Sequence, residues 1–600
     1  MADLVAQDIQ FDPHPDIDGV EKIGTVQGQQ TDRHFARPLR IFPDLPFQCL
    51  VFHLLPPLDF KCRLSPCRLQ FFLAAWNRLV LPPKRARIKP FKMDCGLPVW
   101  GEACRLPPER SLSQGYQLVA FGVKVKNHNK NVDSNRGETM AEAVVGAKRQ
   151  AHQTWSNWPT FIMAVAGSAV GLGNIWKFPY ITGENGGGAF VIVYLICIAA
   201  IGLPVMMTEI MLGRRGRLSP VNSMIELAKE SNRTQRWGLL GVMMMFAAFL
   251  ILSFYSVIAG WAIPYIGHSI TGTFNGASPD QVGGIFGGLL ASPGKLLLWH
   301  TVFMVLTVGV SASGVKAGIE RAVTILMPAL FVLLAGLIVY NLVVDTASFG
   351  KALGFLFNPD FSKLTAEAIL TAIGHAFFTL SIAGGAVFAY GSYLDSGSSI
   401  ATTSFAVAIV DTLVALMAGM AIFPIVFANG LEPGAGPGLV FVTLPIAFGK
   451  MPGGQIVGLL FFVMLVIAAW TSSISMLEAI VEWLQERGMG RAKASASVAG
   501  GAWLLGLTTV LSLNEWKGFH PLGFIGRFEG KTLFDLYDFL TANIMLPLGA
   551  LLMAVFAGWI MTQNDTEDEL AMTSGYGLWR LLIRYVAPIG IGVIFVANLG

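Results

Sequence analysis

Long apolar segments recur through most of this 600-residue chain, and they constrain its fold more than any other feature. From Trp158 onward, stretches of the roughly 20 residues that a helix needs to cross a bilayer alternate with short polar segments. Hydrophobic residues make up 53% of the sequence and charged residues only 13%, which is too apolar for a soluble protein of this length. The sequence therefore predicts an all-α, polytopic membrane protein that lies in the lipid bilayer.

Eleven apolar segments are long enough to span a membrane. They lie near residues 158–180, 188–212, 239–265, 296–312, 322–344, 366–393, 400–426, 455–485, 496–513, 534–560 and 578–598. Because lipid offers the backbone no hydrogen bonds, such segments cross it as helices. We expect about eleven transmembrane helices.

The basic residues near the ends of these segments indicate an orientation. If the chain before the first span lies in the cytoplasm, fifteen Lys and Arg residues fall on the cytoplasmic side and seven fall outside. An excess of Lys and Arg marks cytoplasmic loops. We expect a multi-pass protein of the cell (inner) membrane with a cytoplasmic N-terminus and, after an odd number of spans, a C-terminus outside.

Residues 1–139 differ in composition from the rest. They hold 19 of the 42 Lys and Arg residues and five of the six cysteines, without a hydrophobic period, a span or a signal peptide. We interpret them as a poorly ordered tail or an over-extended gene start, because Met140 would serve as an ordinary start for a transmembrane domain at 140–600. Cys62 and Cys67 lack a second well-placed Cys/His pair, so unpaired thiols are favoured over a zinc site.

Two of the spans contain glycine-rich interruptions. Helix 1 carries GSAVGLGN at 167–174, and helix 6 carries SIAGG at 381–385. Unwound backbone at membrane depth leaves amide and carbonyl groups that only a buried ligand, ion or water satisfies. Glycines also permit close helix packing, but two breaks at matching positions favour a binding site near the middle of the membrane.

The sequence around these breaks resembles a known family. Residues 155–213, which begin WSNWPTFIMAVAGSAVGLGNIWKFPY, are similar to the first two helices of the neurotransmitter:sodium symporter family. The similarity continues through GIERAVTILMPALF at 318–331, AIGHAFFTLSIAGGAVFAYGSYL at 372–394, VTLPIAF at 442–448 and AAWTSSISMLEAIVEWL at 468–484. It implies two five-helix inverted repeats with helices 1 and 6 broken, and sodium-coupled symport by alternating access. Eleven helices suggest the bacterial branch.

The resemblance implies oxygen ligands for one or two sodium ions, since a dry site for this hard cation must offer several oxygens. The first site would comprise the Ala169 carbonyl and the side chains of Asn174, Thr379 and Asp411, with the substrate carboxylate. The second would comprise the carbonyls of Gly167, Val170 and Ala468 and the hydroxyls of Thr471 and Ser472. Without the family match, these two hydroxyls would be expected to bond to their own helix carbonyls.

The resemblance also implies a substrate pocket between helices 1, 3, 6 and 8. Its walls would be Ser168, Ile251, Tyr255, Phe378, Ser381, Gly384, Ser473 and Met476. Three of these residues, Ile251, Phe378 and Met476, are apolar, which favours a hydrophobic substrate over a charged one.

Two glycines bear on the kind of substrate. Family members that carry monoamines have an aspartate where this chain has Gly171. A glycine leaves room for the carboxylate of an amino acid, against the amides of Leu172 and Gly173 and the Tyr255 hydroxyl. Gly384 stands where a leucine-carrying member has a phenylalanine, so a bulky or aromatic side chain is plausible. We expect an amino-acid substrate.

Gating residues follow from the same resemblance. Tyr255 and Phe378 would close over the substrate, and Lys177 would face Asp538 as an outer ion pair. Lysine replaces the usual arginine there, so this pair lacks a bidentate fork.

The inner side carries part of the family's latch. Trp155 and Glu486 match it, but its arginine position holds His152, for which Arg149 could substitute. Glu209, a carboxylate deep in helix 2, is expected to be buried and bonded to the unwound part of helix 6.

Chloride is expected not to be required. Family members that need it hold the anion with a tyrosine, a glutamine, serines and an asparagine. Here Tyr194 matches the tyrosine, but His375, Ala415 and Asp411 replace the glutamine, one serine and the asparagine. Two sodium ions and one carboxylate leave an excess positive charge in a low-dielectric site. Asp411 is either the built-in anion that compensates it or simply an alternative oxygen ligand.

Other function classes are less well supported. The GLGN at 171–174 lacks the third glycine and the preceding strand of a dinucleotide loop, and no nucleophile and base are recognisable, so an enzyme is not expected. A transporter-like sensor would share the binding residues, and only flux distinguishes it. No feature predicts a nucleic-acid partner, and the sequence leaves the oligomeric state open.

Overall fold

The computed structural model describes residues 155–433 and 438–599, and within these ranges every regular element is a helix. The segment 1–139, with its cysteines, and the residues Arg149 and His152 lie outside the described residues. The helices of the spans are α4 (Trp158–Ala169), α5 (Phe178–Glu184), α6 (Gly188–Cys197), α7 (Leu203–Gly216), α9 (Gly238–Ile270), α11 (Pro293–Ala312), α12 (Arg321–Val344), α14 (Ala366–Thr379), α15 (Ala386–Ser392), α16 (Ile400–Ala428), α18 (Gly454–Glu486), α19 (Arg491–Ser512), α20 (Leu533–Phe539), α21 (Leu546–Val555), α23 (Tyr576–Leu581) and α24 (Ala587–Leu599).

Nine helical segments of the described ranges are long and apolar enough to cross a membrane. A tenth crossing is formed by Trp158–Ala169 and Gly173–Glu184, which are bent by 53° relative to each other. The eleventh expected span consists of α14 and α15, which have only 14 and 7 residues. The predicted all-α membrane fold with two broken helices is thereby confirmed.

The first break is short. α4 ends at Ala169, Val170 adopts an extended conformation with φ −70° and ψ 110°, and a π-helical turn over Gly173–Lys177 leads directly into α5. Asn174 closes the gap, because its Oδ1 accepts a hydrogen bond from the Gly171 amide at 3.0 Å. The break therefore frees backbone groups and bends the span by 53°.

The second break is longer and left-handed. Between α14 and α15, the φ values of Ser381, Ala383 and Gly385 are 52°, 64° and 76°. Such values cost a residue with a Cβ roughly 1–2 kcal/mol. The fully buried Glu209 of α7 supports this backbone, since its Oε2 accepts a hydrogen bond from the Ala383 amide at 2.8 Å. This contact agrees with the bond expected for Glu209.

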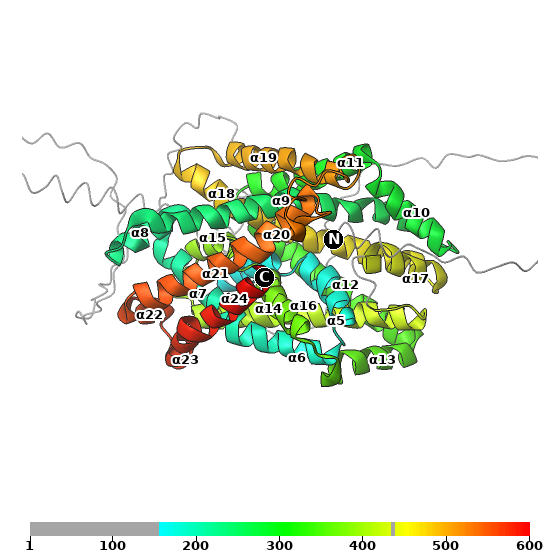
Figure 1. The fold of residues 1–600 in the computed structure, drawn as a ribbon, viewed down its shortest axis with the longest axis horizontal. Helices are drawn as coiled ribbons and strands as arrows, with labels where there is room; N and C mark the ends of the chain where they lie inside the picture. The colour runs from blue at the N-terminus through cyan, green and yellow to red at the C-terminus, as the bar shows by residue number, and fades with distance from the viewer. Residues whose placement is uncertain (1–154, 434–437, 600) are drawn as a thin grey trace, which may run out of the picture. The chain divides into compact units, whose positions relative to one another are not determined.

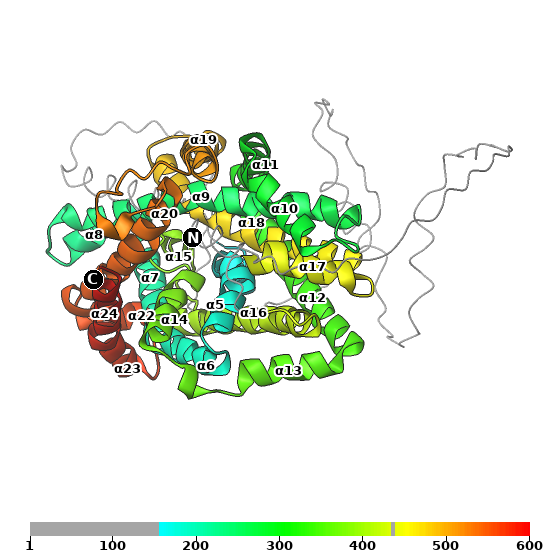
Figure 2. The ribbon, with the colours of Figure 1, turned by 45° about the vertical axis from the view of Figure 1, so that its right-hand side comes forward.

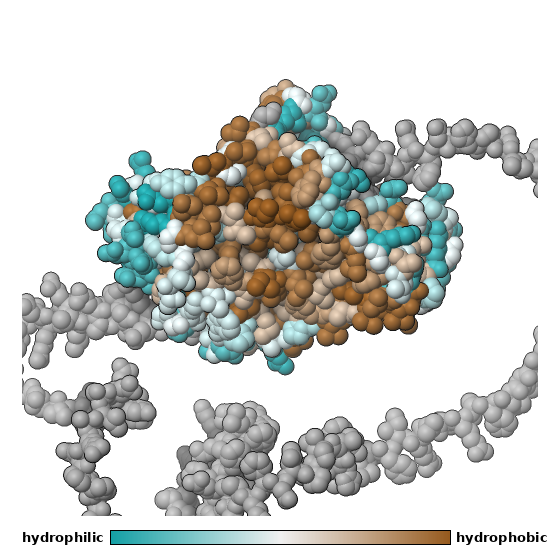
Figure 3. All heavy atoms as spheres, turned by 90° about the horizontal axis from the view of Figure 1, so that it is seen from below, coloured by the Kyte–Doolittle hydropathy of each residue, from teal (hydrophilic) through white to brown (hydrophobic). Residues whose placement is uncertain are grey.

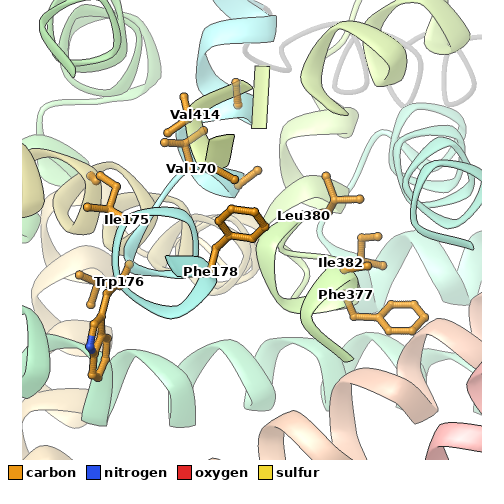
Figure 4. Packing of buried hydrophobic residues seen from close by; sticks show 14 of the residues in the cluster. Val170, Ile175, Trp176, Phe178, Phe377, Leu380, Ile382 and Val414 are labelled. Atoms are coloured by element: carbon orange, nitrogen blue, oxygen red, sulfur yellow. The ribbon is translucent and has the colours of Figure 1, made fainter. Parts of the chain in front are cut away.

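The broken helices lie inside a bundle of long helices. α9 and α18, each of 33 residues, pack against each other, and α4 packs against α12, α16 and α18 (Figures 1 and 2). Buried apolar residues pack around both breaks: Val170 lies beside Val414 of α16, and Phe178 of α5 and Leu380 belong to the same cluster (Figure 4).

Short helices lie at the two ends of the bundle and were not expected from the sequence. At the end where α4 begins lie α8 (Pro220–Glu230) and α22 (Gln563–Leu570); at the opposite end lie α10 (Pro279–Leu290), α13 (Thr346–Phe357) and α17 (Leu444–Lys450) (Figures 1 and 2). We call the first the Trp155 end and the second the Lys177 end.

An apolar band covers the sides of the helices. Figure 3 shows hydrophobic side chains across the middle of one face, with hydrophilic side chains on either side of the band. Residues such as Val332 and Val343 of α12 are 71% and 77% exposed. A soluble protein rarely exposes so large an apolar surface, so the band is the part that contacts lipid.

Candidate functional site

A cavity lies where the two breaks meet α9, α18 and α21. It is lined by Ser168, Ala169, Gly171, Leu172, Gly173, Ala248, Ile251, Tyr255, Phe378, Ser381, Ile382, Gly384, Ala386, Ser472, Ser475, Met476 and Leu546. The structure thus brings together every residue predicted to contact the substrate except one, Ser473.

Ser473 faces away from this cavity. Its Oγ lies 2.8 Å from Thr307 Oγ1 of α11 and donates to the Trp470 carbonyl at 2.8 Å. The preceding residue, Ser472, lines the cavity instead. Successive residues of an α-helix are rotated by about 100°, so a one-residue error moves a side chain to another face. The expected wall residue is therefore corrected from Ser473 to Ser472.

One end of the cavity is formed by the first break and a tyrosine. The Leu172 amide lies 3.5 Å from Tyr255 Oη. A Cβ atom at Gly171 would lie 2.5 Å from Ser472 Oγ and 3.1 Å from Tyr255 Oη, so a side chain does not fit there without displacement. Backbone amides and a hydroxyl in a buried position are suited to an anionic group.

The side chains expected at the first sodium site lie together. Asn174 Nδ2 donates to Asp411 Oδ1 at 2.8 Å and to Thr379 Oγ1 at 3.1 Å. Thr379 Oγ1 lies 3.0 and 3.1 Å from the two carboxylate oxygens of Asp411, which share its one hydrogen. All three side chains are fully buried, and Ala169 lines the adjoining cavity. The carboxylate and hydroxyl oxygens of Asp411 and Thr379 are hard donors that suit sodium, whereas Asn174 presents its Nδ2 to them here and its Oδ1 to the Gly171 amide.

The groups expected at the second sodium site also converge. Ser472 Oγ lies 3.2, 3.4 and 3.5 Å from the carbonyl oxygens of Val170, Ala468 and Gly167. Thr471 Oγ1 lies 3.0 Å from the Ala468 carbonyl. Thr471 Oγ1 thus bonds to carbonyls of its own helix, at Ile467 and Ala468, whereas Ser472 Oγ also reaches the Gly167 and Val170 carbonyls at the end of α4.

Among residues 155–433 and 438–599, no second charged side chain forms an ion pair with Asp411. Tyr194 Oη lies 3.5 Å from Asp411 Oδ2, and its ring lies 5.3 Å from that of His375. Among the described residues, neither ring nitrogen of the buried His375 has a hydrogen-bond partner. Ala415 is fully buried and offers no oxygen from its side chain.

The Trp155 end is held by hydrogen bonds that differ from the expected latch. Trp155 Nε1 donates to the Tyr390 carbonyl at 3.1 Å. Glu486 accepts instead from the Ser219 amide, at 2.6 Å, so no bond joins it to Trp155 in the described part of the chain.

A buried ion pair lies beside Trp155. Tyr393, which directly follows α15, donates to Glu478 at 2.9 Å, and Arg491 of α19 pairs with the same carboxylate at 2.6 Å. Glu478 therefore ties the broken helix 6 to α18 and α19.

The Lys177 end lacks its expected ion pair. Lys177 Nζ lies 4.5 Å from the centroid of the Phe378 ring, a cation–π contact, and no ion pair to Asp538 is formed within the described ranges. A second hollow, lined by both charged residues and by Tyr255 and Phe378, continues outward from the cavity. Lys177, Tyr255 and Phe378 thus lie between the cavity and that end.

Five cavity residues were missed by sequence reasoning. They are Ala248, Ile382, Ala386, Ser475 and Leu546. A helical spacing could have identified two of them, because Ala248 precedes Ile251 by three positions and Ser475 follows Ser472 by three. Leu546 lies on a helix that no sequence motif connects with the breaks.

Comparisons with known proteins agree with this geometry. A model of the sodium:neurotransmitter symporter family matches residues 152–282 and 286–600. A sodium-dependent transporter of Haemophilus influenzae is 36% identical over 458 residues, which cover 74% of this chain and 98% of that protein. The chain belongs to the sodium:neurotransmitter symporter family. A sodium-dependent transporter of Bacillus subtilis is likewise 36% identical, over 74% of this chain and 97% of its own length.

A solved structure supports the same family fold. The crystal structure of MhsT in complex with L-phenylalanine matches with a TM-score of 0.68 and 42% identity, over 74% of this chain and 99% of that chain. This sodium:neurotransmitter symporter is therefore a multi-pass membrane protein, and its family is one of sodium-coupled transporters rather than enzymes.

Proposed function

We propose that this symporter carries a neutral amino acid with a hydrophobic, bulky or aromatic side chain across the cell membrane, together with one or two sodium ions, by alternating access. The observation that carries the proposal is the cavity itself. It borders both oxygen clusters, has the amides of 171–173 and the Tyr255 hydroxyl at one end, and is apolar at the other.

The first cluster links substrate and ion. Ala169 lines the cavity and Asn174, Thr379 and Asp411 lie directly behind it. A substrate carboxylate placed against the amides of Leu172 and Gly173 would supply the remaining oxygen of the first sodium site. Because each ligand then completes the site of the other, binding of the two is coupled.

The other end of the cavity supports a large side chain. Ala248, Ile251, Met476 and Leu546 provide apolar surface. A Cβ atom at Gly384 would meet only the Ser381 carbonyl oxygen, at 3.8 Å, so the space that a side chain would fill is open. MhsT, whose structure contains L-phenylalanine, offers a precedent for an aromatic amino acid.

The charges of the site support independence from chloride. Asp411 is fully buried and accepts hydrogen bonds from Asn174 and Thr379. A fixed carboxylate at this place would offset the charge of the sodium ions as chloride does elsewhere in the family. The alternative, that Asp411 is only an oxygen ligand, makes a different prediction for chloride replacement.

Alternating access requires that each end open in turn. We assign the Trp155 end to the cytoplasm, which leaves the C-terminus outside, because Arg214, Arg215 and Arg487 lie there. The Glu478–Arg491–Tyr393 cluster would close this end, with Trp155 and Glu486 in supporting contacts. Lys177 and Asp538 would form the outer ion pair when that end closes.

The test is an uptake screen with the purified full-length chain in proteoliposomes. Each common amino acid is offered with an inward sodium gradient and, as control, an equal potassium gradient. We expect uptake of large neutral amino acids that requires sodium. Uptake of monoamines or charged amino acids, or uptake of the same size in potassium, would contradict the proposal, and saturable binding without flux would identify a sensor.

A further inference from the structure

Two serine hydroxyls lie hydrogen-bonded to each other in the wall of the cavity. Ser168 precedes the first break and Ser475 lies on α18; both line the cavity and both are 1% exposed. Ser168 Oγ donates to Ser475 Oγ at 2.8 Å, and Ser475 Oγ donates to the Ser472 carbonyl at 2.7 Å. Because a hydroxyl has one hydrogen to donate, both donors are used within the protein.

What remains free on Ser168 is its capacity to accept. A hydroxyl oxygen has two acceptor lone pairs, and among the described residues no group donates to Ser168 Oγ. The neighbouring Ser381 hydroxyl also uses its hydrogen within the protein, since it donates to the Ser168 carbonyl at 2.8 Å, and its oxygen keeps the capacity to accept. The serine chain therefore ends in an oriented acceptor next to the cavity.

The serine pair lies away from the end that suits a carboxylate. Ser168 precedes Gly171 in the direction of the Trp155 end, and Ser475 follows Ser472 in the same direction along α18. On α9, the cavity extends from Tyr255 back to Ala248, seven residues, or roughly 10 Å of helix. A substrate with its carboxylate near Tyr255 would thus direct its side chain toward the serines.

The rest of this end is apolar. Ala248, Ile251, Ala386, Met476 and Leu546 line the cavity with apolar surface and contribute no side-chain hydrogen-bonding group other than the weak sulfur of Met476. In such surroundings an oriented acceptor can discriminate between substrates, because a donor on the substrate loses its water and must find a partner.

We propose that Ser168 accepts a hydrogen bond from an O–H or N–H group on the substrate side chain, and that Ser475 is the residue that orients it. The site would then favour tyrosine over phenylalanine, which has the same shape without the hydroxyl. This inference rests on the proposed function and specifies the substrate class of that same cavity.

The experiment compares three competitors of sodium-driven L-phenylalanine uptake in proteoliposomes of the full chain. They are L-tyrosine, unlabelled L-phenylalanine, and O-methyl-L-tyrosine, which keeps the oxygen but lacks the donor hydrogen. In wild type we expect tyrosine to compete about three- to tenfold better than phenylalanine. The methyl ether should lose this advantage.

Variants separate the contact from general damage to the cavity. Ser168→Ala and Ser475→Ala should each reduce the ratio of tyrosine to phenylalanine affinity toward one. Ser256→Ala is the matched control, because this buried serine bonds to its own helix at Leu252 and does not line the cavity. The control should keep the wild-type ratio.

The outcomes also distinguish this inference from the proposed function. If wild type shows no sodium-driven uptake of any large neutral amino acid, the proposed function fails. If it carries phenylalanine but tyrosine has no advantage, or if the methyl ether competes as well as tyrosine, only the inference is overturned. A ratio that survives both serine variants overturns it as well.

Discussion

The two helix breaks of this symporter differ in length, conformation and neighbours. The first is brief, and Val170 in an extended conformation is enough to turn carbonyls toward α18. The second covers residues 380–385 and holds two non-glycine residues in a left-handed conformation, Ser381 and Ala383. The first break borders the oxygen clusters, whereas the second lines open space in the cavity. One break is thus suited to binding ions and the other to making room for a side chain.

This comparison predicts that the second break depends more on outside support. Left-handed backbone at residues with a Cβ is costly, and the buried Glu209 carboxylate holds the Ala383 amide. Glu209→Ala would leave that amide unpaired, at a cost of about 1–3 kcal/mol. We expect loss of nearly all uptake and a lower melting temperature.

Glu209→Gln provides the matched control, because its amide oxygen can still accept the bond from Ala383. It should retain a substantial part of wild-type uptake. Normal transport and thermal stability in Glu209→Ala would show that the second break needs no such support.

The second prediction concerns ion binding and is tested by replacing Asp411. Wild-type uptake should be the same when chloride is replaced by gluconate, because the buried carboxylate already offsets the sodium charge. In Asp411→Asn we expect the half-saturating sodium concentration to rise about tenfold, since one charged ligand contact is lost. The measurement is initial uptake against sodium concentration in both anions.

Each result of this experiment separates the two roles of Asp411. If wild-type uptake depends strongly on chloride, Asp411 does not act as the built-in anion. A weaker sodium affinity in the variant without any new chloride dependence would leave Asp411 only its role as an oxygen ligand.

The third prediction concerns the size of the substrate side chain and is tested by replacing Gly384. Its open surroundings predict that Gly384→Phe fits but fills the cavity, so preference should shift from large toward small aliphatic amino acids. We expect the affinity for phenylalanine relative to that for alanine or valine, measured by competition, to fall about tenfold. The added side chain removes a cavity volume equivalent to a few methylene groups. Gly384→Ala should show a smaller shift in the same direction, whereas an unchanged profile in both would place the size limit elsewhere.

The smallest effect on uptake is expected from deleting the N-terminal segment, which is far from both breaks in the sequence. Residues 1–139 have neither core periodicity nor a span, so a chain that starts at Met140 should keep sodium-driven uptake within about twofold of the full chain. Loss of uptake, measured at equal protein in proteoliposomes, would assign this segment a function in transport.

Much of this architecture could be predicted because its signals are local. Span lengths follow from apolar runs, and the breaks follow from glycine clusters within them. The positions that could not be predicted depend on the rotation of a helix about its axis or on the distance between two helices. Ser472 and Ser473 differ by one helical step, and only the packing of α18 against α4 decides which one faces the cavity.

The gates show the same limit. Lys177 and Asp538 belong to different helices, and their pairing depends on how close those helices are in a given conformation. In this structure Lys177 contacts Phe378 instead. Likewise, at the Trp155 end, Glu486 accepts a hydrogen bond from the Ser219 amide, and Arg491 forms an ion pair with Glu478. Pairings of this kind are set by tertiary structure, which a single sequence does not contain.

The central claim is that the two breaks together form one site in which sodium and an amino acid bind cooperatively. The most direct measurement is binding of labelled phenylalanine to the purified full chain as sodium replaces potassium at constant ionic strength. We predict that affinity rises at least tenfold with sodium and that Ser472→Ala, which loses an oxygen of the second cluster, needs more sodium for the same effect. Equal affinity in sodium and potassium would contradict the account.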